Sequence, residues 1–168
     1  MQKSDILMLY DYNCWANQRI LAAAAKVSEE NFITPASPNL GSLRSTLVHT
    51  LGAEWVWRTR CQEEISPAAL LAEADFPTLP LLRERWQTEE QTMRAYLNSL
   101  SDEQFSQSIP YKSLSGQPYT TILWQILAHV VNHGTQHRAE CAARLTDLGH
   151  SPGDMDMILY TREQQARS

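Results

Sequence analysis

The stretch from Thr121 to Leu148 constrains the fold most, because it carries the longest helical pattern in the chain. Apolar residues return along it with a period close to 3.6, which places them on one face of an α-helix. Gly149 and then Pro152 follow, in the order typical of a helix C-terminus. Such a helix is stable when its apolar stripe packs against other elements, so the pattern predicts a chain of packed helices. The stripe consists of Ile122, Leu123, Ile126, Leu127, Val130, Cys141, Leu145 and Leu148.

Three further segments have a helical pattern. Asp5 to Val27 repeats apolar residues without Gly or Pro, Leu43 to Arg60 is apolar and aromatic, and Thr78 to Leu100 starts with a cap and an early proline. The prolines and glycine of Ser101 to Thr120 predict a structured connection with a short hairpin, and Asp154 to Gln165 predicts a short terminal helix. We therefore expect an all-α four-helix bundle with a short C-terminal helix, in one domain spanning residues 1–168.

Composition excludes several classes of function. The net charge of −5 repels phosphate backbones, so nucleic acid is not an expected partner. Neither an export signal nor a run of about twenty apolar residues occurs, so no membrane insertion is expected. Cys14, Cys61 and Cys141 are far apart and form no CxxC pair, which favours neither disulfides nor a thiolate zinc site. A reducing cytoplasm is the expected location.

Three histidines on the last long helix, His129, His133 and His137, repeat at every fourth position. Residues four apart differ by about 40° around a helix and rise roughly 6 Å, so adjacent imidazoles of this series can reach one metal ion, whereas all three cannot easily do so. His137 lies nearest the centre of the apolar stripe, His133 about 40° further out and His129 about 80°. We predict His133 and His137 as the metal-binding pair, with His129 in place of His137 as the alternative.

A third ligand is expected from His49, in the nearly apolar helix predicted for Leu43 to Arg60. A metal normally needs at least three protein ligands, and a histidine on such a helix is expected to be buried and to need a partner. Three imidazoles without a thiolate suit Zn²⁺ or Ni²⁺, with one or more positions left for water. His129 and His150 are better explained as ordinary surface or core residues.

Polar residues on apolar stripes are the second unusual feature. Asn13 and Asn17 lie where core packing predicts apolar side chains. They either line a polar pocket beside the metal, or have a structural role in which they bond to facing backbone or sit at the bundle edge. Glu54 and Glu140 are candidates for orienting a ligand histidine through its second ring nitrogen, although solvated helix carboxylates are common. Cys14 has no basic neighbour in sequence that would activate it as a nucleophile.

Three segments carry a resemblance to a known family: LYDYNCWANQRIL, LVHTLGAEWVWR and LAHVVNHGTQHRAECAARLTDLGHSPGDMDMILY. In this order, and over essentially the whole chain, the sequence resembles the DinB/YfiT-like metalloenzyme family, which is distinct from the DNA polymerase that shares the DinB name. The resemblance implies a four-helix bundle, often dimeric, with a metal on His49, His133 and His137. One departure follows the motif: similar members commonly read HRGQ where this chain has His137-Arg138-Ala139-Glu140.

The sequence leaves two alternative hypotheses about the function. The first is a metal-dependent enzyme with an open coordination position, and the family resemblance implies transferase or hydrolase chemistry on a small molecule, with a low-molecular-weight thiol as a partner. The second is a non-catalytic, stress-related helical protein whose metal is structural or adventitious. A homodimer is expected in both cases, because the segment Leu43 to Arg60 is apolar on more of its circumference than one bundle core can cover. No sequence motif names a substrate.

Overall fold

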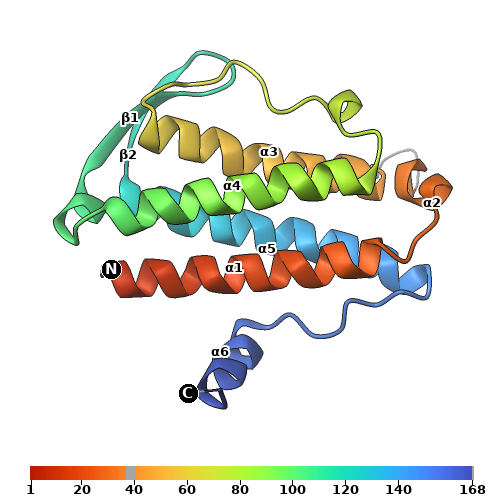
Figure 1. Cartoon of the computed structure of the whole chain (residues 1–168). Coiled ribbons are helices and arrows are strands. Elements are labelled where there is room, and N and C mark those ends of the chain that lie inside the picture. Colours follow the sequence, from red (N-terminus) through yellow and green to blue (C-terminus); the bar gives the residue numbers. More distant parts are fainter. Residues whose placement is uncertain (37–40, 168) are drawn as a thin grey trace.

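Four long helices run side by side in the computed structural model, which describes residues 1–36 and 41–167 (Figure 1). Helix α5 packs against α1 and α3, and α4 packs against the same two helices, so the ring order is α1–α4–α3–α5. The all-α four-helix bundle predicted from the sequence is confirmed. Its long helices are α1 (Lys3–Ala24), α3 (Leu43–Gln62), α4 (Leu79–Ser99) and α5 (Leu123–Asp147).

The helix ends follow local chemistry. The Ser42 hydroxyl accepts a hydrogen bond from the Ser45 amide at 3.0 Å and caps α3, and Pro80 stands in the first turn of α4. Gly149 ends α5 in the left-handed conformation, with φ of 79°, so that the next amide, of His150, reaches the Leu145 carbonyl at 2.8 Å. The predicted stop after α5 is therefore confirmed.

Several helix boundaries differ from the prediction by one to three residues. Helix α1 ends at Ala24, before the predicted Val27, and a short helix α2 (Glu29–Ile33) follows, capped by the Ser28 hydroxyl on the Asn31 amide at 3.2 Å. Helix α5 begins at Leu123, because the two residues before it belong to a strand. The predicted terminal helix is present as α6 (Met157–Gln165).

A hairpin closes one end of the bundle, as the sequence predicted (Figure 1). Strands β1 (Ser108–Lys112) and β2 (Pro118–Ile122) are antiparallel, with Tyr111 opposite Tyr119. The Arg60 guanidinium of α3 lies 4.5 Å from the ring centre of Trp57 and 5.0 Å from that of Tyr111, and it donates to the Lys112 carbonyl at 2.9 Å. This stacked cation fixes the hairpin to α3. Two short 3-10 turns, η1 (Glu73–Asp75) and η2 (Glu103–Ser106), complete the connections.

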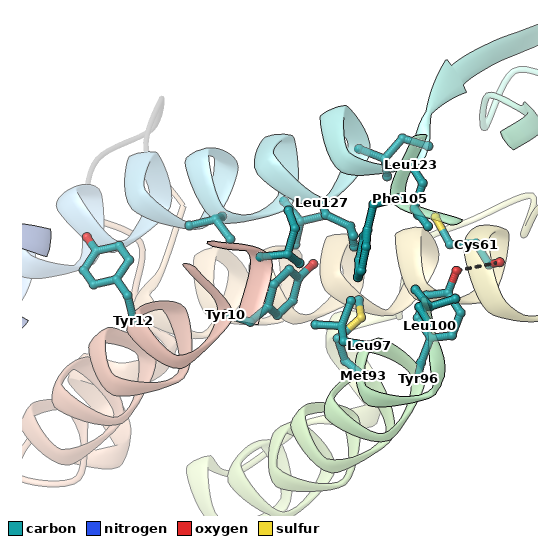
Figure 2. Packing of buried hydrophobic residues seen from close by; sticks show 14 of the residues in the cluster. Tyr10, Tyr12, Cys61, Met93, Tyr96, Leu97, Leu100, Phe105, Leu123 and Leu127 are labelled. Atoms are coloured by element: carbon teal, nitrogen blue, oxygen red, sulfur yellow. Dashed lines mark hydrogen bonds between the residues drawn. The ribbon is translucent and has the colours of Figure 1, made fainter. Parts of the chain in front are cut away.

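The core at the hairpin end joins every long helix (Figure 2). Phe105, from η2, is fully buried between α4 and α5, and the Tyr96 hydroxyl donates to the Cys61 carbonyl at 3.1 Å, joining α4 to α3. Burying a large apolar side chain of this kind contributes about 1.5–3 kcal/mol. Buried members of this core include Tyr10, Tyr12, Cys61, Met93, Tyr96, Leu97, Leu100, Phe105, Leu123 and Leu127 (Figure 2).

Most apolar side chains of α3 are covered within the one chain. Leu47, Leu51 and Val56 are buried, and the large apolar residues that the structure exposes lie on other elements. Trp55 and Trp57 are only half-buried, so α3 leaves a small apolar surface accessible, and dimerisation stays a prediction. In the described part of the chain, none of the helices combines the length and the apolar character that a membrane span requires.

Candidate metal centre

His49 of α3 and His133 and His137 of α5 converge in the space between these two helices. The Nε2 atom of His133 lies 3.3 Å from that of His49 and 3.2 Å from that of His137, and ligand nitrogens of all three lie within 4.8 Å of one another. Each side chain is half-buried. Three imidazole nitrogens at this spacing fit one divalent ion with Zn–N bonds of about 2.0–2.1 Å.

The helical repeat explains which histidines meet. His133 and His137 are one turn apart on the face of α5 that meets α3, as the sequence predicted. His129, one turn earlier, is exposed and packs its ring edge-on against Trp57, with 5.5 Å between ring centres. His150 lies beyond the end of α5. Neither belongs to the cluster, which agrees with the choice of His133 and His137, although metal binding itself stays a prediction.

The environment favours the uncharged form of two of the three imidazoles, those of His49 and His133. Burial, together with the smaller effects of the neighbouring imidazoles of His137 and His49, lowers the pKa of His133 to about 4. Burial also lowers the pKa of His49, as does His137, against a smaller opposing effect of Glu140. Neutral imidazoles present free lone pairs, so a metal ion does not have to displace protons from these two at neutral pH.

Glu140 contacts the second ring nitrogen of His137, as was expected of one of the two candidate carboxylates. The Nδ1 atom of His137 lies 2.8 Å from Oε2 of Glu140, three residues further along α5. The carboxylate can only accept, so Nδ1 donates and carries the ring proton. Nε2 of His137 then faces the other imidazoles with its lone pair.

Glu54 does not orient a histidine, so that part of the prediction is wrong. Its side chain is buried, and Oε1 accepts from the amides of Asn13 and Asn17 at 2.8 and 3.0 Å, while Oε2 accepts from the Trp86 indole at 2.9 Å. Burial raises the pKa of Glu54, whereas these three hydrogen bonds lower it. The carboxylate satisfies buried donors from α1 and α4 and does not reach the metal-binding cluster.

Asn13 and Asn17 are buried, as their position on the apolar stripe indicated, but neither proposed role is correct. Their amide groups donate to Glu54, and their oxygens accept from one nitrogen of Arg138 at 2.5 and 2.9 Å. The two side chains therefore bridge a buried carboxylate and a buried guanidinium instead of bonding to backbone or lining a metal pocket. This set of Asn13, Asn17, Glu54, Trp86 and Arg138 is called the buried polar network below.

Arg138 is the member of this network that sequence reasoning missed. It is 3 % exposed, follows His137 directly, and also donates to the Thr135 hydroxyl at 2.9 Å. Gly134, next to His133, makes room for it, because a Cβ there would lie 2.7 Å from the guanidinium and 2.9 Å from the Asn13 oxygen. One face of α5 thus carries metal-ligating candidates while the adjacent face is tied to α1.

The cysteines supply no nucleophile. All three are free, as the sequence predicted, and Cys61 and Cys141 are buried. Burial raises the pKa of each of these two thiols to about 12, and it also raises the pKa of Cys14. Thiols in such surroundings stay protonated at neutral pH and are unreactive.

Comparisons with known proteins agree with this fold. Protein DinB of Bacillus subtilis is 28 % identical over 163 residues, covering 90 % of this chain and 91 % of that protein. A DinB-like protein from the same species, YjoA, superposes with a TM-score of 0.64 at 15 % identity, over 85 % of this chain and 92 % of its own.

YfiT from Bacillus subtilis superposes with a TM-score of 0.61 at 19 % identity, covering 90 % of this chain and 91 % of that one. It is described as "a probable metal-dependent hydrolase with an unusual four-helix bundle topology". At these identities the two structures establish likeness of fold alone. The family model of the DinB family matches residues 1–168, and the chain therefore belongs to the DinB family.

Proposed function

We propose that this protein is a metal-dependent enzyme that acts on a small molecule at a centre held by His49, His133 and His137. The observation that carries the proposal is the convergence of three half-buried imidazoles from two helices, with ligand nitrogens within 4.8 Å. The description of the structural neighbour YfiT as a metal-dependent hydrolase supports the same class of reaction. The physiological metal is proposed to be Zn²⁺ or Ni²⁺, since both accept neutral imidazole ligands.

The donor set fits a catalytic better than a closed structural site. Among the residues that the structure describes, the cluster contains three ligand groups, whereas structural zinc sites have four protein ligands. When bound, a divalent metal at such a site lowers the pKa of a coordinated water or thiol toward neutrality. The protein's own contribution is to keep His49 and His133 neutral and to leave all three imidazoles partly exposed, so that a small molecule can reach them.

A low-molecular-weight thiol is the partner that we propose for the reaction, and hydrolysis is the alternative. The cysteines of the chain are protonated thiols, so a thiol nucleophile would have to come from solution. With cobalt in the site, a thiol that binds the metal adds a charge-transfer band, whereas a hydrolase without thiol affinity gives none.

Metal analysis of five alanine variants tests the proposal. Replacing His49, His133 or His137 should abolish stoichiometric metal binding, because each removes one of three converging ligands. Replacing His129 or His150 should leave it unchanged, since these lie outside the cluster, and the two variants serve as matched controls. Retention of stoichiometric metal by the His49 variant would exclude the proposed centre.

A further inference from the structure

The contact between Glu140 and His137 distinguishes one of the three candidate ligands from the others. Among the described residues, this is the ion pair that joins a carboxylate to a histidine. Its oxygen lies 2.8 Å from Nδ1, while Nε2 of the same ring lies 3.2 Å from Nε2 of His133. We propose that Glu140 is a positioning residue, which fixes the tautomer and orientation of His137 and whose negative charge strengthens metal binding. The inference rests on the proposed function.

Tautomer selection follows from the hydrogen bond. A neutral imidazole carries its proton on either ring nitrogen, and only the unprotonated nitrogen can bind a metal. By accepting from Nδ1, Glu140 holds the proton there and leaves the lone pair on Nε2, the atom that faces His133. Without this carboxylate, His137 would populate both tautomers and more ring orientations, and each metal-binding event would have to select the right one.

The position of Glu140 allows this role at little cost. It lies three residues after His137 on α5, where side chains are neighbours on the helix surface. The glutamate side chain is 49 % exposed, so its charge stays hydrated on one side, whereas the histidine side chain is 16 % exposed and is held by its neighbours. A carboxylate in this place needs no rearrangement of the core.

The charge of Glu140 has a separate effect from its hydrogen bond. Three neutral imidazoles leave the double charge of a metal ion uncompensated, and a carboxylate hydrogen-bonded to one of them increases the electron density on that ligand. The charge therefore predicts that this chain binds its metal more tightly than a form of itself with glutamine at position 140.

Two substitutions separate the hydrogen bond from the charge. Glu140→Gln keeps an oxygen that can accept from Nδ1 but removes the charge, and Glu140→Ala removes both. Asp147→Asn is the matched control, because it removes the same charge from an exposed residue of the same helix about 10 Å further along, away from the histidines. Zinc dissociation constants are measured by competition with a chelator, and cobalt spectra report on the coordination geometry.

The alanine variant should bind zinc on the order of 10- to 100-fold more weakly, with the glutamine variant between it and the wild type. The control should bind as the wild type does, and the unfolding temperatures of all metal-free forms should agree. Wild-type affinity in the alanine variant would overturn the role of Glu140, and wild-type affinity in the glutamine variant would overturn the effect of its charge. If the unsubstituted protein binds no metal, the proposed function itself fails.

Discussion

Gly134→Ala should destabilise the protein, although alanine is the better helix former. The residue lies within α5, where replacing glycine by alanine ordinarily stabilises a helix by about 1 kcal/mol. Here the added methyl group would stand 2.7 Å from a guanidinium nitrogen of Arg138 and 2.9 Å from the Asn13 oxygen. Both distances are shorter than van der Waals contact, so one of these groups has to move.

The structure sets the size of the effect. The nitrogen that the methyl group meets donates to Asn13 at 2.5 Å and to Asn17 at 2.9 Å, and hydrogen bonds to charged groups contribute about 1.5–3 kcal/mol each. If the guanidinium moves enough to lose one of them, the loss of this hydrogen bond less the gain in helix propensity leaves a net destabilisation of roughly 0.5–2 kcal/mol. For a chain of this length that corresponds to a fall of about 1–8 °C in unfolding temperature.

Gly52→Ala provides the comparison, since Gly52 is also buried within a long helix. A Cβ there would meet its nearest atom, the Leu71 amide nitrogen, at 3.4 Å, which is close to ordinary contact. Urea unfolding of both variants without metal should show Gly52→Ala within about 1 kcal/mol of the wild type or more stable. A Gly134 variant as stable as the Gly52 variant would refute the reasoning that Arg138 fills the space above this glycine.

Three further predictions concern charge and assembly. Burial raises the pKa of Glu90 to about 7, so between about pH 4.5 and 7 the folded state holds a proton that the unfolded state releases, and the protein loses stability as the pH rises through this range. Glu90→Gln should remove this pH dependence and stabilise the protein at pH 8 by roughly 1 kcal/mol, measured by thermal unfolding. Glu54→Gln should cost about 2–3 kcal/mol in urea unfolding, because its new NH₂ group would face either the amide donors of Asn13 and Asn17 or the indole donor of Trp86. An unchanged stability would contradict the buried polar network. Light scattering should give the mass of a homodimer, and a monomer at micromolar concentration would exclude that prediction.

The sequence predicted the bundle because each long helix has its own apolar period and its own end signals. Gly149 and Pro80 marked boundaries that the structure contains. The end of α1 was harder to predict, because the alanine-rich residues after Leu21 include no helix breaker. The cap of α2, Ser28 followed by two glutamates, was a signal present in the sequence that the prediction did not use.

The candidate site was predictable in part for a similar reason. The spacing of His133 and His137 is a property of one helix, so it could be read locally, and His49 stood out in an apolar segment. The buried polar network depends instead on which helices face each other. An arginine after a histidine reads as a surface residue, and only the approach of α1 to α5 makes Arg138 a buried partner of Asn13. Glu54, in the same predicted helix as His49, was expected to contact a histidine, whereas it contacts Asn13, Asn17 and Trp86.

The two helices that supply the candidate ligands are far apart in sequence, since His49 and His133 are separated by 84 positions. A metal ion shared between them would act as a reversible cross-link that closes a long loop containing α4 and the hairpin. An ion that binds the folded state alone stabilises it by about 2.7 kcal/mol when its free concentration is a hundred times its dissociation constant. Helices α1 and α6 lie outside that loop, so amide exchange in the metal-loaded protein should slow more between residues 49 and 133 than in the terminal helices.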